Sequence, residues 1–264
     1  MKFYNEALVT KALFSSLVLL QGALVADGHY GFPTVVVNGI ESEWWEYVRD
    51  VGYGPYTGQF FPIYDWHEEG QVCGYNGTKT GHGTKTLKVE AGTNIKFVAY
   101  SSTYQSGDIA PHPYYNDSDG INHNGPGQAY MSLAPGALED YDGSGDWFKI
   151  GSYGSTDGQY WDTDHDRSGM NFTIPKTTPP GKYLLRVEHF NISPYLNGTQ
   201  QFINCAHVEV GGPGGGTPGP TTKFPGAYDI RDSAIWLPTA MWAPYKPTPL
   251  LKAYKGPGPE VWKG

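Results

Sequence analysis

Short β-prone runs recur along the chain, and this recurrence constrains the fold more than any other feature of the sequence. They are rich in Val, Ile, Thr, Phe and Tyr, several alternate polar and apolar residues, and Gly, Pro, Asn or Asp separates them. The runs cover residues 34–37, 86–89, 94–100, 127–131, 171–174, 182–188 and 206–210. Because no helical period accompanies them, we predict an all-β fold: an antiparallel β-sandwich of the immunoglobulin-like or fibronectin type, with long loops.

Two long connections interrupt the predicted strands. Residues 101–125 and 139–169 are rich in Gly, Asp, Ser and Tyr and are too long for tight hairpins. Because long loops on a rigid scaffold often carry function, we predict that both are functional loops.

The composition agrees with this fold and limits the partners. With 36 Gly, 21 Pro and only 17% charged residues, the chain lacks the Ala, Glu, Lys and Leu runs of a helical bundle. A formal net charge of -8 disfavours binding to nucleic acid or to an anionic membrane. We therefore expect a neutral or cationic partner, and a polysaccharide is one neutral partner that suits aromatic surfaces.

The first segment, residues 1–28, is predicted to be a secretory signal peptide. Two lysines accompany an apolar run that is too short to span a bilayer, and small residues follow. A buried N-terminal helix is the alternative. Cleavage after Ala26 would leave Asp27 first, whereas cleavage after Gly28 would leave His29 first. In either case we expect an extracellular protein.

Secretion gives the two cysteines a role. In an oxidising compartment Cys73 and Cys205 most simply form one disulfide, with two free thiols as the alternative. The same compartment suits five Asn-x-Ser/Thr sequons, which are candidate glycosylation sites at Asn76, Asn116, Asn171, Asn191 and Asn197.

The chain divides by composition near residue 211. Residues 29–211 hold the predicted strands, and residues 212–264 begin with a Gly/Pro-rich linker. The segment after the linker is short, has no cysteine and is rich in aromatic residues, which makes it marginal as an independent domain. We predict that this extension packs on the sandwich. A disordered stalk and a separate carbohydrate-binding module are the alternatives.

The histidines suggest one metal site. None of the eight forms a zinc-type pair, and no nucleophile elbow is present. If His29 comes first in the mature chain, its α-amine and imidazole can chelate one metal, and a second imidazole completes a T-shaped three-nitrogen site suited to copper. Surface or structural positions are expected for His67, His82, His112, His165 and His207.

A family resemblance follows from an ordered set of segments. These are residues 29–33 (HYGFP), 37–39 (VNG), 45–49 (WEYVR), 123–131 (HNGPGQAYM), 147–150 (WFKI), 174–175 (IP), 180–188 (PGKYLLRVE), 200–205 (QQFINC) and 223–228 (KFPGAY). Together they resemble the fungal lytic polysaccharide monooxygenases of auxiliary-activity family nine, formerly glycoside hydrolase family sixty-one.

The resemblance implies a twisted β-sandwich that binds one copper ion in a histidine brace. His29 would supply the α-amine and one ring nitrogen, His123 would supply the other ring nitrogen, and the two cysteines match the family's disulfide. The implied reaction is hydroxylation of C1 or C4 of cellulose or a related β-1,4-glucan. It would use O2 or H2O2 and an external electron donor, either a small reductant or a secreted redox protein. We expect a monomer.

Two positions depart from the family pattern. Phe202 stands at the axial position, where the family usually has Tyr, and Ser193 stands where the family commonly has an outer-sphere His. His189 lies too far along the strand to replace that His. Gln200 matches the family's outer-sphere Gln. Two alternatives therefore stay open beside the enzyme: a copper-binding member that does not cleave, and a non-catalytic carbohydrate-binding sandwich.

Overall fold

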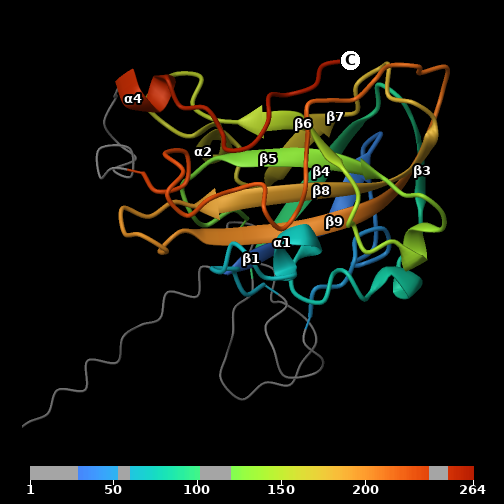
Figure 1. Cartoon of the computed structure of the whole chain (residues 1–264), viewed down its shortest axis with the longest axis horizontal. Helices are drawn as coiled ribbons and strands as arrows, with labels where there is room; N and C mark the ends of the chain where they lie inside the picture. Colours follow the sequence, from blue (N-terminus) through green and yellow to red (C-terminus); the bar gives the residue numbers. More distant parts are fainter. Residues whose placement is uncertain (1–28, 53–59, 102–119, 238–248) are drawn as a thin grey trace, which may run out of the picture.

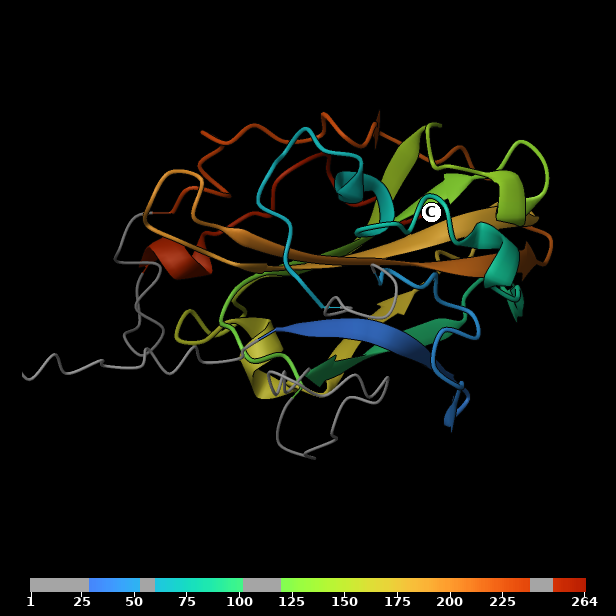
Figure 2. The ribbon, with the colours of Figure 1, turned by 90° about the horizontal axis from the view of Figure 1, so that it is seen from below.

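Two β-sheets pack face to face in the computed structural model, which describes residues 29–52, 60–101, 120–237 and 249–264. Figure 1 labels the strands, and Figure 2 shows the sheets as two layers, with the blue β1 in one and the orange β8 and β9 in the other. The four-stranded sheet has the order β2 (Ile40–Glu41), β1 (Tyr30–Val37), β4 (Asn94–Ser101), β7 (Gly169–Thr173). The six-stranded sheet has the order β10 (Thr221–Thr222), β6 (Trp147–Tyr153), β5 (Gly127–Leu133), β8 (Gly181–Asn191), β9 (Gln200–Gly211), β3 (Leu87–Glu90).

The helices are short and lie in the connections. They are α1 (Gly70–Cys73), α2 (Asp162–His165) and α4 (Pro249–Lys252), with 3-10 turns η2 (Gly81–Gly83) and η3 (Leu138–Asp140). Within the described ranges, none of the helices has the length and apolar character needed to cross a membrane.

The predicted β-sandwich is confirmed, and each of the seven predicted runs overlaps a strand. Local sequence explains the first hairpin: Asn38 and Gly39 link β1 to β2 with φ of 53° and 77°. Two consecutive positive φ values are typical of the tight type I′ turn, which Asn-Gly favours and which matches the twist of the strands.

Two details differ from the sequence-based prediction. The sandwich is not wholly antiparallel, because β3 pairs with β9 in parallel. Strand β6 lies inside the segment 139–169, which was expected to be a loop. Trp147, Phe148, Lys149 and Ile150 are all buried, so this short segment lacks the alternation that marks a half-buried strand.

Apolar side chains form two cores, one on each face of the six-stranded sheet. The first lies between the sheets and includes Phe97, Met131 and Val187. The second covers the outer face, where Tyr130 and Leu184 meet side chains of the C-terminal extension. The extension contributes Phe224, Tyr228, Ile235, Leu237 and Leu251. Strand β8 is therefore buried on both of its faces.

The predicted disulfide is confirmed. It joins Cys73 at the end of α1 to Cys205 in β9 across 132 residues of sequence, and both side chains are fully buried. It ties the connection that follows β2 to the outer face of the six-stranded sheet.

Candidate metal centre

His29 and His123 meet at one end of the sandwich. His29 directly precedes β1 in one sheet, and His123 lies four residues before β5 in the other. The Tyr30 and His123 ring centroids are 5.9 Å apart, and the Phe202 and His123 centroids are 5.8 Å apart. Strands from both sheets thus bring the two predicted ligands and the predicted axial residue Phe202 into one cluster.

Burial keeps the His123 imidazole neutral. Desolvation, then repulsion from His29, then repulsion from Arg167 lower the pKa of His123 from 6.5 to about 4. At neutral pH one ring nitrogen therefore carries a lone pair. A neutral imidazole nitrogen is a donor that copper favours, so the residue type and its protonation state both fit a metal ligand.

Arg167 holds the segment that carries His123. Its Nη1 donates to the carbonyl oxygen of Ile121 at 3.0 Å, and its Nη2 donates to Asn124 Oδ1 at 2.6 Å. The same Nη2 pairs with Asp164 Oδ1 at 2.6 Å. Because the guanidinium contacts residues on both sides of His123, it fixes this segment relative to the edge of the four-stranded sheet.

His189 supports the site from beneath, a role that sequence reasoning missed. Its Nε2 donates to the carbonyl oxygen of Gly125 at 3.1 Å, so its Nδ1 accepts the hydrogen bond from the Tyr30 hydroxyl. Burial lowers the pKa of His189 to about 3, which keeps the ring neutral for both contacts. The sequence signal for this role is weak, because the same strand also carries Lys182, Arg186 and Glu188.

Phe202 contributes a ring and no donor atom. It stacks on Tyr30 with centroids 4.0 Å apart and an interplanar angle of 23°. Both side chains are buried, so the position beside His123 is filled by carbon.

The predicted outer-sphere residues have different surroundings. The Ser193 hydroxyl accepts a hydrogen bond from the backbone N–H of Tyr195 at 3.1 Å, within the β8–β9 connection. Gln200 begins β9, and its Nε2 donates to the hydroxyl of Tyr64 at 2.6 Å. Gln200 is two residues before Phe202 and on the same face of the strand, so it lies toward the metal centre.

Two side chains alone do not complete a metal site. Among the described residues, no three His, Cys, Asp or Glu side chains come together to hold a metal ion. A centre with two imidazole ligands therefore needs a further nitrogen. In a chain that begins at His29, the α-amine of that residue would supply it, and His29 is already one of the two ligands. The donor set fits copper, which accepts nitrogen ligands in such an arrangement.

Comparison with known proteins identifies the family. The family model "Auxiliary Activity family 9 (formerly GH61)" matches residues 29–247. The chain belongs to this family. Among curated relatives, AA9 family lytic polysaccharide monooxygenase U of Thermothielavioides terrestris is 38% identical, over 96% of this chain and 98% of the relative. AA9 family lytic polysaccharide monooxygenase C of Emericella nidulans is also 38% identical, over 92% of this chain and 95% of the relative.

Solved structures share the fold. The extended catalytic domain of H. jecorina LPMO9A matches with a TM-score of 0.67 at 24% identity, covering 89% of this chain and 92% of that one. A cellulose-active polysaccharide monooxygenase from M. thermophila matches with a TM-score of 0.65 at 22% identity, covering 89% and 100%. Family membership makes this chain a copper-dependent enzyme of oxidative polysaccharide cleavage, as the sequence predicts.

The predicted sequons of this family member differ in their surroundings. Asn171 on β7 and Asn197 in the β8–β9 connection are exposed. The side-chain amides of Asn76 and Asn191 each donate a hydrogen bond within the protein, at 2.7 Å and 2.6 Å. Asn116 lies outside the described residues.

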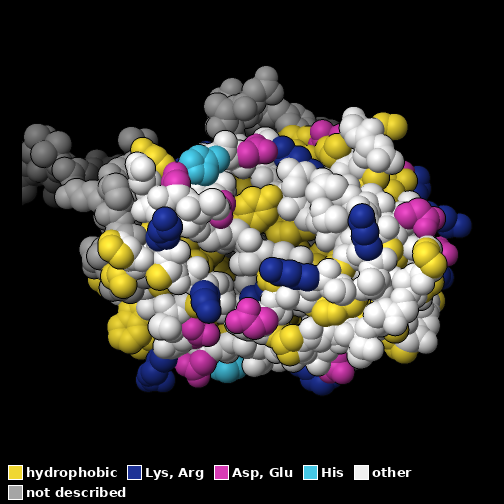
Figure 3. Space-filling view, turned by 90° about the horizontal axis from the view of Figure 1, so that it is seen from above, with side chains coloured by type: hydrophobic (Ala, Val, Ile, Leu, Met, Phe, Trp, Pro, Cys, Tyr) yellow, Lys and Arg dark blue, Asp and Glu magenta, His cyan; other side chains and the backbone are white. Residues whose placement is uncertain are grey.

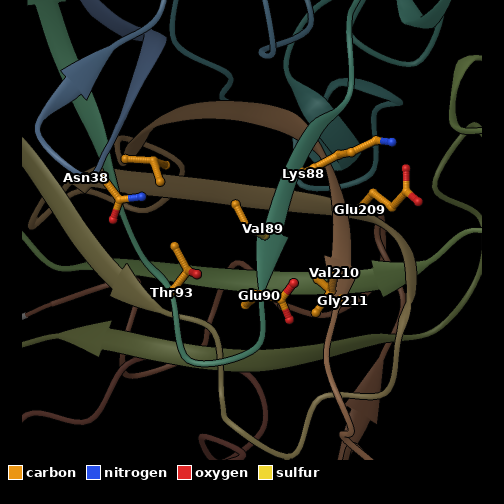
Figure 4. Close-up of a pocket in the computed structure, with 9 residues that line it drawn as sticks. Asn38, Lys88, Val89, Glu90, Thr93, Glu209, Val210 and Gly211 are labelled. Atoms are coloured by element: carbon orange, nitrogen blue, oxygen red, sulfur yellow. The ribbon is translucent and has the colours of Figure 1, made fainter.

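Two other surfaces formed by described residues offer no comparable cluster. A hollow of about 430 Å³ lies between the β1–β2 turn and the paired edge of β3 and β9, and the Glu90 and Glu209 carboxylates that line it do not converge (Figure 4). On the face shown in Figure 3, basic and acidic side chains are interspersed, so this face presents no basic patch.

Proposed function

We propose that the chain is a secreted monooxygenase that oxidises C1, C4 or both in cellulose or a related β-1,4-glucan. The proposed co-substrate is O2 or H2O2, and an external donor supplies the electrons. The observation that carries this proposal is the pairing of His29 and His123 at one end of the sandwich. The match to the family begins at His29, which supports signal cleavage after Gly28.

In the mature chain, His29 would offer its α-amine and one ring nitrogen, and His123 would offer one ring nitrogen. Copper, when bound by these groups, supplies the redox chemistry that activates the co-substrate. The depressed pKa of His123 means that no proton has to leave this ring before it binds the metal at neutral pH. Arg167 and His189 hold the backbone around His123 through Ile121 and Gly125.

Exposed rings beside the ligands suit an uncharged polymer. Phe61 is 45% exposed and lies next to His29, with ring centroids 5.3 Å apart. Tyr64, three residues later, is 42% exposed. Aromatic rings present flat apolar faces of the kind on which sugar rings stack, and they carry no charge that would select an ionic ligand. We therefore propose that a glucan chain contacts Phe61 and Tyr64 while its reactive carbon faces the metal.

Phe202 gives the metal centre one dry side. Its ring stacks on Tyr30 and offers no hydrogen bond, so water and oxygen species find no protein donor at this position. Gln200 is the polar residue proposed to face the co-substrate. We propose that the enzyme acts as a monomer outside the cell.

The test uses mature protein whose N-terminus has been identified by mass spectrometry. Copper-loaded protein that begins at His29 is incubated with cellulose, a reductant and O2 or H2O2, and the soluble products are separated by mass. We expect oligosaccharides oxidised at C1 or C4.

Two variants control this experiment. A chain that keeps residues 25–28 before His29 retains every side chain but displaces the α-amine by four residues, so it should lose high-affinity copper binding and oxidation. His123→Ala should lose both as well. The proposal is wrong if the chain that begins at His29 binds copper no better than the longer chain, or forms no oxidised product on any of several β-glucans.

A further inference from the structure

Gln200 is held from two sides by hydrogen bonds that use most of its side-chain amide. Asn191 Nδ2 donates to Gln200 Oε1 at 2.6 Å, and Gln200 Nε2 donates to the Tyr64 hydroxyl at 2.6 Å. An amide group can donate two hydrogen bonds and accept two. With Oε1 turned toward Asn191 and one N–H turned toward Tyr64, the direction of the remaining N–H is fixed.

We propose that Asn191 and Tyr64 are positioning residues that aim the free N–H of Gln200 at the metal centre. This inference rests on the proposed function, because it assigns Gln200 a partner in the reaction. It also assigns Asn191, a sequon residue, to the site rather than to glycan attachment.

The contact with Asn191 is built into the sheet. Asn191 and Gln200 are the last paired residues of the β8–β9 ladder, so their side chains project from the same face at neighbouring positions. The half-buried Asn191–Gln200 pair is thus set by strand register and does not depend on the conformation of the β8–β9 connection.

The contact with Tyr64 comes from a different segment, which the sheet also holds. Ile63 and Gln201 exchange two backbone hydrogen bonds, with N to O distances of 2.8 Å and 3.0 Å. These bonds fix the backbone next to Tyr64 against the backbone next to Gln200. Tyr64 can therefore keep its hydroxyl on Gln200 while part of its ring faces outward, where the proposed polymer lies.

The hydrogen bonds from Asn191 and to Tyr64 matter more in this chain because it lacks the family's outer-sphere His. The residue at that position is Ser193, whose hydroxyl is bound to the backbone N–H of Tyr195. Phe202 adds no hydrogen bond either. In the part of the chain that the structure describes, Asn191 and Tyr64 hold the Gln200 amide by hydrogen bonds, so its orientation depends on them.

The first experiment reads the Gln200 amide without metal or substrate. Mature protein is made in a bacterial periplasm, which adds no N-glycans, and its side-chain amide signals are recorded by ¹H–¹⁵N NMR. The pair of signals that disappears in Gln200→Ala belongs to Gln200. We expect Tyr64→Phe to shift one of the two Nε2–H signals strongly, and Asn191→Leu to shift both. Unchanged signals in either variant would overturn the proposal.

The second experiment separates positioning from polymer binding. Tyr64→Phe keeps the ring, so retention of the metal-free protein on cellulose should stay within about twofold of wild type. The rate of oxidised-product formation should fall about 10-fold or more, as is typical when an outer-shell partner of a metal site is lost. In a Gln200→Ala background, the same substitution should change the rate less than twofold, because residues that act as one unit are not additive.

An equal loss from Tyr64→Phe in both backgrounds would overturn the proposal, because Tyr64 would then act without Gln200. If wild-type protein forms no oxidised product, the proposed function fails, and the NMR signals of the metal-free protein still decide whether Asn191 and Tyr64 orient Gln200.

Discussion

At the level of single residues, the position of His123 depends on Arg167. We predict that Arg167→Leu weakens copper binding by the mature chain about 10-fold, because the contacts to Ile121 and Asn124 that hold the His123 segment are lost. Isothermal titration with copper measures this loss. The substitution also removes one positive charge near the ligands, and this effect on its own would favour cation binding.

Lys96→Gln is the matched control for charge. Lys96 pairs with Asp166, one residue before Arg167, and also hydrogen-bonds to Ser168, so its substitution leaves the Arg167 bonds to Ile121 and Asn124 in place. Its loss should leave copper affinity within about twofold of wild type. Equal weakening by both substitutions, or none by Arg167→Leu, would contradict a role in holding His123.

Single residues also mark how far the sequence predicts the site. His29, His123, Phe202 and Gln200 were recognisable because each stands in a short motif with fixed neighbours. His189 lies too far along the strand from Ser193 to take the place of the family's outer-sphere His. It reaches the site through hydrogen bonds to Tyr30 and Gly125 instead.

At the level of elements, the C-terminal extension is anchored by Tyr228. Its hydroxyl contacts the buried Glu188 carboxylate and lies 2.8 Å from Gln128 Nε2 and 2.8 Å from the Tyr130 hydroxyl. We predict that Tyr228→Phe lowers the free energy of unfolding by about 1–3 kcal/mol, because buried polar groups lose a partner. Urea titration measures the change.

Tyr195→Phe makes the same chemical change on a ring that is 77% exposed, and it should alter the free energy of unfolding by less than about 0.5 kcal/mol. If Tyr228→Phe is no more destabilising than this control, the extension is not held by the hydroxyl of Tyr228.

Elements show why the fold was predictable in outline and not in full. Alternation of polar and apolar residues predicts the half-buried strands. On β4, for example, Ile95, Phe97 and Ala99 face the core between the sheets. Strand β6 has no such alternation because the extension covers its outer face. The backbone N–H of Trp262, more than 100 residues further along the chain, donates to the carbonyl oxygen of Lys149. The parallel pairing of β3 with β9 also joins distant segments, and no local pattern specifies it.

At the level of the whole molecule, the disulfide closes a loop that spans both sheets. It links positions 132 residues apart, and the chain-entropy relation gives about 5 kcal/mol of stabilisation for a loop of that size. We predict that replacing both Cys73 and Cys205 by Ala lowers the free energy of unfolding by this order, measured by urea titration at fixed pH. A loss below about 1 kcal/mol would mean that the unfolded chain is already restricted without the bond.

A buried histidine far from the metal centre makes the stability of the whole molecule depend on pH. His207 is fully buried, and its Nε2 accepts a hydrogen bond from Arg49 Nε at 2.8 Å. Burial, and then the Arg49 charge, lower the pKa of His207 from 6.5 to about 3. The folded protein therefore keeps this ring neutral between these values, whereas the unfolded chain protonates it.

Because the unfolded state binds the extra proton, the free energy of unfolding must fall as pH falls below 6.5. The His207 contribution approaches about 1.4 kcal/mol for each pH unit and ends near the folded pKa. We predict that metal-free His207→Gln, compared with metal-free wild type by urea titration from pH 8 to 4, loses this part of the slope below pH 6.5. Between pH 7.5 and 8 the two slopes should coincide, whatever constant offset the substitution adds. Equal slopes down to pH 4 would show that His207 takes up a proton in the folded protein and that the contact with Arg49 does not keep it neutral.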